Sequence, residues 1–252
     1  MLREKKTIVV AGCGEIGKPI YQLCCSGYEQ VIVEDPRYGK PEKPLYPVAA
    51  LHVAIPGSIE SFVQIITDYY KKYKPGIILI HSSTAPGTTK QVENAVGVDN
   101  IAHTQVHGKH HGNKMRSDML HYPKFVATSS GIAFDKAKEI LEQMGHPAKK
   151  ILHLTDSFVG ELSKLLATTF FGYMIVWTQE IERMSKQFNV DYDELMSFTK
   201  LLTDDFNISQ IYPGVIGGHC VMQNIEILNN VYPTMLWDYM MQSNDKKRED
   251  QS

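Results

Sequence analysis

Three glycines near the N-terminus, Gly12, Gly14 and Gly17, have the spacing of a loop that binds a diphosphate. The first permits a tight turn, the second lets the backbone approach the phosphates, and the third lets a helix pack closely on a strand. Free N–H groups at the start of that helix would attract the negative charge. We therefore expect a dinucleotide here, held also by Glu15 and Ile16.

An acidic residue lies where the ribose of such a dinucleotide should sit, at the end of the next predicted strand. Asp35 would accept hydrogen bonds from the ribose hydroxyls and repel a 2′-phosphate, which favours NAD. Glu34 could take this role instead, and Arg37 keeps NADP as an alternative. S-adenosylmethionine is another adenosine ligand for such a loop, and a loop shaped only for packing is the remaining interpretation.

Lys164 lies in a helical segment that is otherwise apolar on its inner face. A lysine there can donate a proton to a developing alkoxide, or accept one if its pKa is lowered. The alternative is a solvent-facing lysine whose alkyl stem packs along the helix.

A histidine-rich segment also carries basic side chains. Its members are His103, His107, Lys109, His110, His111, Lys114 and Arg116. One or two histidines could act as acid–base groups near a nicotinamide, or the segment could form a positive pocket for a carboxylate or phosphate. An exposed polar loop is the plain alternative. We expect no metal, because no Asp or Glu lies among these residues.

These residues need a framework of alternating strands and helices. Strands are predicted at 7–11, 31–33, 49–55, 76–81, 101–103 and 124–127, and helices at 18–26, 58–73, 88–96 and 133–144. The alternation predicts an α/β fold with a Rossmann-type doubly wound parallel sheet. Pro56 and Ser83, which follow the third and fourth strands, are expected to contact the dinucleotide.

The character of the chain changes after about residue 151. An apolar-periodic segment over 158–188 and a helix over 191–203 predict a smaller all-helical region. We therefore expect a dinucleotide-binding domain over 1–152, a helical substrate or dimerisation region over 153–242, and a disordered polar tail over 243–252.

Composition excludes several classes of partner. The 252 residues carry a net charge of −2 without a polybasic run, so nucleic acid is not expected. We expect no membrane span, because no apolar stretch approaches the roughly 20 residues required. The four cysteines suggest neither a disulfide framework nor a zinc site, and the N-terminus has no signal peptide, which favours the cytoplasm.

Four segments follow one another in an informative order. They are 83–89 (STAPGTT), 161–164 (ELSK), 179–180 (QE) and 214–220 (GVIGGHC). They resemble the STVPPGTT segment, the ELxK helix, the NE pair and the GxGGxC loop of the UDP-glucose/GDP-mannose dehydrogenase family. The 6-phosphogluconate and 3-hydroxyacid dehydrogenases are more distantly similar.

The resemblance implies a reaction and three residues for it. That family oxidises a sugar-nucleotide alcohol with NAD through intermediates on a cysteine, so Cys220 would be the nucleophile. Lys164 would handle protons and Thr84 would lie near the nicotinamide. Without the resemblance, Cys220 could be a buried, inert thiol and Thr84 a helix N-cap.

The chain departs from the family at three polar positions. The family's asparagine one turn after the lysine is Thr168, its aspartate four residues after the cysteine is Asn224, and its catalytic glutamate corresponds to His107. The family's C-terminal nucleotide-binding domain has no counterpart. We therefore expect a two-electron oxidation or reduction of a small alcohol or aldehyde, not of a UDP-sugar.

Two other functions stay open at this point. One is a transferase on the same scaffold that binds S-adenosylmethionine, and the other is a non-catalytic nucleotide-binding partner protein. The resemblance also implies a homodimer through the long helix, where Phe158, Leu162, Phe170 and Phe171 offer an apolar surface.

Overall fold

The computed structural model describes residues 4–108, 114–205, 211–217 and 220–251. The chain divides into two compact units, Met1–Lys164 and Leu165–Ser252, which are described separately below. The division falls after residue 164, whereas the sequence placed it after residue 152.

The first unit contains one seven-stranded sheet. Its strands are β1 (Glu4–Ala11), β2 (Tyr28–Glu34), β3 (Val48–Val53), β4 (Ile78–Ile80), β5 (Ile101–His103), β6 (Lys124–Ala127) and β7 (Ile151–Leu154). They lie in the order β2-β1-β3-β4-β5-β6-β7, and all neighbours are parallel except β5 and β6. The predicted α/β Rossmann-type class is confirmed. The reversal at β6 was not predicted, because an apolar run of four residues does not encode strand direction.

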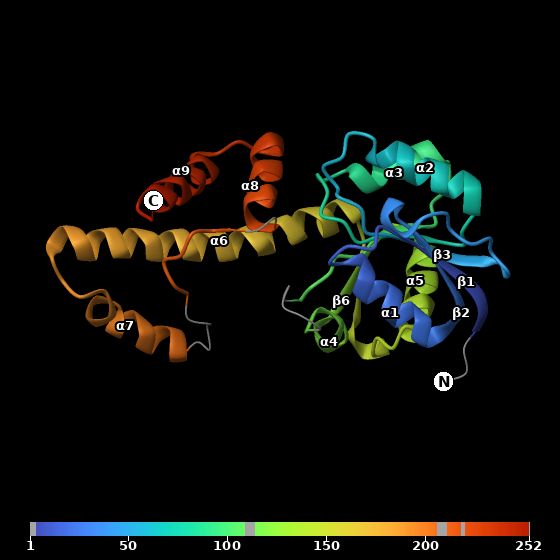
Figure 1. Cartoon of the computed structure of the whole chain (residues 1–252), viewed down its shortest axis with the longest axis horizontal. Helices are drawn as coiled ribbons and strands as arrows, with labels where there is room; N and C mark the ends of the chain where they lie inside the picture. Colours follow the sequence, from blue (N-terminus) through green and yellow to red (C-terminus); the bar gives the residue numbers. More distant parts are fainter. Residues whose placement is uncertain (1–3, 109–113, 206–210, 218–219, 252) are drawn as a thin grey trace. The chain divides into compact units, whose positions relative to one another are not determined.

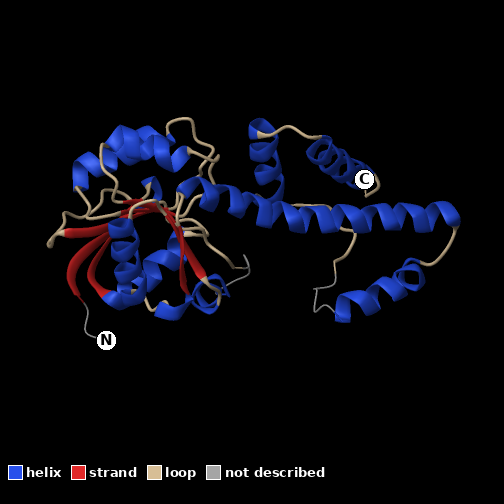
Figure 2. Ribbon diagram, turned by 180° about the vertical axis from the view of Figure 1, so that it is seen from behind, coloured by secondary structure: helices blue, strands red, loops and turns tan. Residues whose placement is uncertain are grey.

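Helices cover both faces of this sheet (Figures 1 and 2). On one face lie α1 (Gly17–Gly27), α4 (Lys114–His121) and α5 (Gly131–Gln143); on the other lie α2 (Phe62–Tyr73) and α3 (Thr88–Val96). Alternate residues of β1 enter the two cores: Ile8 and Val10 pack with α1, whereas Val9 packs with α2. This alternation follows from the two-residue period of a strand that is buried on both faces. Short 3-10 helices occur at Pro36–Tyr38 and Ala148–Lys150.

The chain changes direction across the sheet at β1. Helix α1, which follows β1, covers one face of the sheet, and α2, which follows β3, covers the other, so the neighbouring strands β1 and β3 form the topological switch point of the sheet. The glycine-rich turn that begins at Gly12 lies at this point.

The second unit is helical. It contains residues 165–188 of α6 (Ser157–Phe188), together with α7 (Tyr192–Asp205), α8 (Cys220–Val231) and α9 (Met235–Glu249). Its small core consists of Val176, Ile216, Ile225 and Met240. A Cβ on Gly172 of α6 would lie 2.5 Å from Val221 Cγ1, so this glycine lets α8 approach α6 closely.

The prediction of a disordered tail over 243–252 is wrong for most of its length. Helix α9 continues to Glu249, and Ser243, Asn244 and Lys247 are buried. Their polar groups have partners in the unit: Ser243 donates to Gln179, and Lys247 pairs with Glu182 of α6. The polar composition of this segment therefore reflects contacts with side chains and backbone rather than with solvent alone.

Helix α6 is the one described helix that is long and apolar enough to cross a membrane, judged by length and composition alone. The expectation that no apolar stretch approaches this length is therefore wrong for α6. The core helix of a water-soluble protein passes the same test.

Candidate active site

The glycine-rich turn is shaped by close backbone contacts. Gly12 has φ of +84°, and a Cβ there would lie 2.6 Å from Ala54 O, just after β3. A Cβ on Gly17 would lie 1.8 Å from Gly12 O, which no rearrangement of a side chain could relieve. Around Gly14 the nearest atom to an added Cβ is Arg37 Nη2 at 4.0 Å. The first and third glycines are therefore required by the turn, and the second leaves room above the backbone.

The start of α1 fits an anion. Its N-cap residue, Ile16, makes no side-chain capping bond, and no acidic side chain lies in the first turn. No side chain of the N-cap residue or of the first turn therefore competes with an anion for the amides at this helix start, which suits a diphosphate. Glu15 is exposed beside the turn.

The other predicted dinucleotide contacts follow β3 and β4 at the same edge of the sheet. Pro56 is exposed and Ser83 is partly buried. Gly57 brings their loops together, since its Cβ would lie 2.0 Å from Ser83 O. The structure thus gathers the loops after β1, β3 and β4 at one edge, as parallel neighbours require.

Asp35 is buried at the end of β2 and its carboxylate is fully engaged. It accepts hydrogen bonds from Cys13 N at 2.8 Å and from Arg37 through N, Nε and Nη2 at 3.0, 2.9 and 2.7 Å. The Arg37 guanidinium holds the pKa of Asp35 well below its usual range. Arg37 itself is exposed, so its side chain can turn toward solvent without disturbing the core.

Glu34 is committed elsewhere. Its carboxylate pairs with Lys72 and accepts from the Tyr73 hydroxyl, both on α2. Burial, followed by this hydrogen bond, raises the pKa of Tyr73 to about 12. The geometry therefore favours Asp35 over Glu34 as the residue that faces a ribose.

Thr84 is buried and contacts the Glu161 carboxylate, and it is not the N-cap residue of α3. Its hydroxyl donates to Glu161 Oε1 at 3.3 Å, and the same carboxylate accepts from Gly87 N at 2.6 Å and Thr89 N at 2.7 Å. Glu161, on the first turns of α6, thus caps α3, whose own N-cap is Gly87 without a side-chain bond. Sequence reasoning named Glu161 only as part of the 161–164 segment and assigned it no function, although its place three residues before Lys164 puts both on one helix face.

Lys164 and His107 come together on the segment after β5. Lys164 Nζ donates to Val106 O at 2.8 Å, and His107 is the next residue along the chain. The His107 ring contacts Tyr122, with ring centroids 4.3 Å apart. Burial, then the charge of Lys164, lowers the pKa of His107. An imidazole that is neutral near pH 7 can accept a proton beside the lysine.

The other described residues of the histidine-rich segment do not form one site with His107. His103 is wholly buried on β5, faces Ser82 O at 3.1 Å, and has a pKa lowered to about 4 by burial. Lys114 and Arg116 are exposed on α4. Lys109, His110 and His111 lie outside the described residues. Across those that are described, no group of three or more His, Cys, Asp or Glu is arranged to hold a metal ion.

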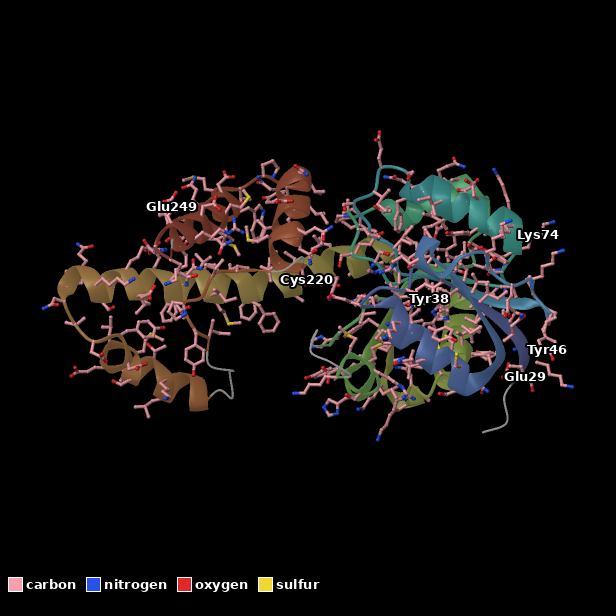
Figure 3. The ribbon with its side chains drawn as sticks, in the orientation of Figure 1. Glu29, Tyr38, Tyr46, Lys74, Cys220 and Glu249 are labelled. Carbon is pink, nitrogen blue, oxygen red and sulfur yellow. The ribbon has the colours of Figure 1, made fainter. Side chains whose placement is uncertain are left out.

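The second unit carries the other predicted catalytic residues. Cys220 is exposed and is the first residue of α8 (Figure 3). Asn224 is buried one turn later on the same helix. Thr168 is partly buried one turn after Lys164 along α6. Cys220 is therefore not buried, in contrast to the alternative interpretation.

Two buried side chains fix the loop before Cys220. Asn244 of α9 accepts from Ile216 N at 2.7 Å and donates to Ile216 O at 3.1 Å. Gln179 of α6 donates to Gly214 O at 2.7 Å. Sequence reasoning noted Gln179 only as part of a motif and missed Asn244, since nothing in a polar C-terminal segment indicates which residue is buried.

Comparisons with known proteins give a family match for the second half of the chain. Residues 159–246 match the family described as UDP-glucose/GDP-mannose dehydrogenase family, central domain. No protein of curated function matches the sequence significantly.

Solved structures match over nearly the whole chain. The UDP-D-ManNAc dehydrogenase of Pyrococcus horikoshii is 17% identical with a TM-score of 0.74, over 96% of this chain and 68% of its own. The UDP-N-acetyl-mannosamine dehydrogenase of Staphylococcus aureus is 17% identical with a TM-score of 0.72, and the match covers 96% of this chain and 68% of that one. The conserved protein MTH1747 is 14% identical with a TM-score of 0.70, and the match covers 97% of this chain and 98% of that one. MTH1747 is described as of unknown function and structurally similar to 3-hydroxyacid dehydrogenases. The chain thus resembles the UDP-glucose/GDP-mannose dehydrogenase family, whose central domain its residues 159–246 match, and shares a fold with sugar-nucleotide dehydrogenases.

Proposed function

We propose that this chain is a NAD-dependent oxidoreductase that transfers hydride to or from a small alcohol or aldehyde. One observation carries the proposal: the close-packed Gly12–Gly17 turn opens a helix that has no side-chain cap, beside a buried aspartate. The family match at residues 159–246 supports the same class of reaction.

The nicotinamide, when bound, supplies the hydride acceptor or donor. The chain supplies binding and proton handling. Gly14 leaves room for the diphosphate, and Asp35 would accept from the ribose hydroxyls once Arg37 turns away. Thr84 is fixed near the carboxyl end of β4 by Glu161.

Lys164 is the residue best placed to move the substrate proton. Its ammonium donates to Val106 O, next to His107; in this charged form it can protonate an alkoxide, and as a neutral amine it can take the proton of an alcohol. His107 stands where the resembled family has a glutamate, which replaces a negative charge by a neutral base. This change, together with Thr168 and Asn224, supports a substrate that is not a UDP-sugar, and a two-electron reaction in place of two successive oxidations.

We favour NAD over NADP because the Asp35 carboxylate would face a 2′-phosphate. Arg37 offsets part of this repulsion as long as it stays paired with Asp35. The preference therefore depends on the charge of Asp35, which its low pKa keeps ionised throughout the neutral range.

Calorimetric titration tests the cofactor directly. We expect NADH to bind at least tenfold more tightly than NADPH, and Asp35→Asn to reduce this ratio, since the amide keeps the shape and removes the charge. Asp68→Asn, on the exposed face of α2, is the matched control and should leave the ratio unchanged. Binding of S-adenosylmethionine without binding of either nicotinamide cofactor would replace the dehydrogenase by the transferase.

Turnover tests the role of Lys164. With a small alcohol or aldehyde that changes NADH absorbance, Lys164→Ala should lower kcat by at least about 100-fold with little effect on NADH affinity. Lys136→Ala, which removes a partly exposed lysine of α5, should change neither value. Full activity of Lys164→Ala would remove the proposed proton step while leaving the cofactor site intact.

We also propose a homodimer in a reducing compartment. Phe158, Phe170 and Phe171 are each about half exposed on α6, and Leu162 is partly buried. None of the four cysteines forms a disulfide, which suits the cytoplasm. A monomeric sedimentation coefficient at micromolar concentration would count against the dimer.

A further inference from the structure

A cavity of about 280 Å³ opens beside the start of β2 in the first unit. Its lining comes from α1, from β2 and from the loop after β2, and consists of Tyr21, Cys25, Tyr28, Glu29, Gln30, Val31 and Glu42. Because β1 and β2 are parallel and the glycine turn follows the end of β1, the cavity lies at the opposite edge of the sheet. Helix α1, with 11 residues, extends roughly 16 Å between the two places. The proposed reaction therefore does not use this cavity.

The rim of the cavity is negatively charged. Glu29 and Glu42 are both exposed, and neither forms an ion pair with any residue that the structure describes. Of the described side chains that line the cavity, none is a Lys, Arg or His. Two carboxylates on one cavity without a counter-charge attract a cation.

The backbone beside Glu42 is fixed by the buried amide of Gln30. Gln30 Nε2 donates to Lys43 O at 3.0 Å, and Gln30 Oε1 accepts from Leu45 N at 2.7 Å. The same oxygen accepts from the Thr7 hydroxyl at 2.8 Å. The loop that carries Glu42 is thus attached to β2 before any ligand arrives, so a ligand does not have to order it.

Tyr28 brings an unpaired hydroxyl to the same cavity. Its side chain is 1% exposed and belongs to the core beside α1, yet its hydroxyl has no hydrogen-bond partner among the described residues. Burial, followed by the charge of Glu4, raises the pKa of Tyr28, so the phenol is neutral. A buried hydroxyl without a partner is unfavourable, and its oxygen can accept from an N–H donor that enters the cavity.

The end of α1 adds a further attraction for positive charge. The helix ends at Gly27, and its last turn, which includes Cys25, contains no basic residue. The carbonyl groups at the C-terminus of a helix carry a partial negative charge that favours cations. No lysine or arginine of this turn supplies one.

Tyr21 and Val31 give the cavity an aromatic and an apolar wall. Tyr21 shares a hydrogen bond with the Cys25 thiol, and an aromatic face attracts an organic cation. A bare metal ion fits less well, because Ca²⁺ takes six to eight oxygen ligands. Among the described residues, no group of three or more His, Cys, Asp or Glu is arranged to hold one. The lining therefore suits a cation that also carries an alkyl chain.

We propose that this cavity binds a small aliphatic ammonium ion. Its charge lies between Glu29 and Glu42, one N–H donates to the Tyr28 hydroxyl, and its alkyl chain packs on Tyr21 and Val31. The site is separate from the dinucleotide turn and does not depend on the proposed reaction.

Calorimetric titration of the full chain with n-butylammonium chloride tests the proposal, and sodium butyrate is the matched ligand with the opposite charge. We expect saturable binding of butylammonium that weakens as salt is added, and no binding of butyrate. Saturating NADH should leave the butylammonium affinity unchanged, because the two places lie at opposite ends of α1. Equal binding of butyrate, absence of butylammonium binding, or competition by NADH would overturn the proposal.

Variants locate the binding within the cavity. Glu29→Gln combined with Glu42→Gln should weaken butylammonium binding about tenfold, since both carboxylates are exposed and each contributes a modest ion pair. Asp135→Asn, which removes an exposed carboxylate on α5, is the control and should change nothing. An unaltered affinity in the double variant would overturn the site. NADH affinity should stay the same in all of these variants, so failure here leaves the proposed cofactor site intact.

Tyr28→Phe separates binding from packing. The substitution keeps the ring and removes the unpaired hydroxyl, so butylammonium should bind about fivefold more weakly. The melting temperature should stay the same or rise, because no hydrogen bond within the chain is lost. A lower melting temperature with unaltered butylammonium affinity would show that the hydroxyl serves the fold, and would overturn its place in the site.

Discussion

Two glycine-rich loops, one in each unit, are held in different ways. At Gly12 and Gly17 an added Cβ would collide with backbone atoms, so glycine is demanded by the turn itself. At Gly214 and Gly217 nothing lies within 4 Å of an added Cβ, and the loop is held by the side chains of Gln179 and Asn244. A local backbone constraint thus shapes the first loop, and contacts with distant parts of the sequence shape the second.

The same contrast extends to the buried polar groups of the two units. The sheet unit encloses neutral imidazoles: His52, His81, His103 and His146 are all buried. The second unit has a single histidine in its sequence, His219, outside the described residues, and encloses amides and an ion pair instead. The two units should therefore respond differently to acid.

Acid should produce the largest effect, and mainly in the sheet unit. Burial lowers the pKa of His52 and His146 to about 3 and of His103 to about 4, whereas an unfolded histidine titrates near 6.5. Between pH 6.5 and 4 the unfolded chain binds more protons, so stability present above pH 6.5 is lost as pH falls, by on the order of several kcal/mol.

Hydrogen exchange measured by mass spectrometry would follow this loss in each unit. Exchange in β3, β4 and β5 should accelerate between pH 6.5 and 4 after correction for the intrinsic rate. Trp177 and Trp237 both lie in the second unit, so their fluorescence provides the control and should change less. Unfolding of both units at the same pH would contradict the predicted difference in acid stability.

Replacing glycine by alanine in each loop tests how far each turn depends on glycine. Gly17→Ala should destabilise the sheet unit by more than about 3 kcal/mol and abolish dinucleotide binding, because the Cβ meets backbone 1.8 Å away. Gly214→Ala is the matched variant and should change stability by less than about 0.5 kcal/mol. Denaturant titration and calorimetry with NADH measure both. Equal effects at the two positions would show that the loops do not differ in this way.

Asn244→Ala should have a smaller effect that is confined to the second unit. It leaves both polar groups of the Ile216 backbone without their partner, which costs roughly 2 to 4 kcal/mol. Hydrogen exchange over 211–217 should increase, and the alkylation rate of Cys220 should change with it. Asn229→Ala, which removes an exposed contact with Asp238, is the control. Unaltered exchange over 211–217 would mean that Asn244 does not hold the loop.

The part of the candidate site that depends on residues close together in the sequence could be predicted. Gly12, Gly14, Gly17 and Asp35 were identified because a glycine turn between a buried strand and a helix has few other uses. Glu161 received no role, since a carboxylate that caps a distant helix leaves no periodic signal. The polar segment around Asn244 was misjudged for the same reason.

The sequence by itself determined the alternation of strands and helices, the dinucleotide turn and the long apolar helix, because each depends on residues near one another in the chain. Only the tertiary structure decided that β6 runs against β5, that Asp35 pairs with Arg37 and that Asn244 holds the loop before Cys220. These features depend on which polar groups meet after folding, and a hydrogen bond between distant residues is fixed by geometry that composition and periodicity do not encode.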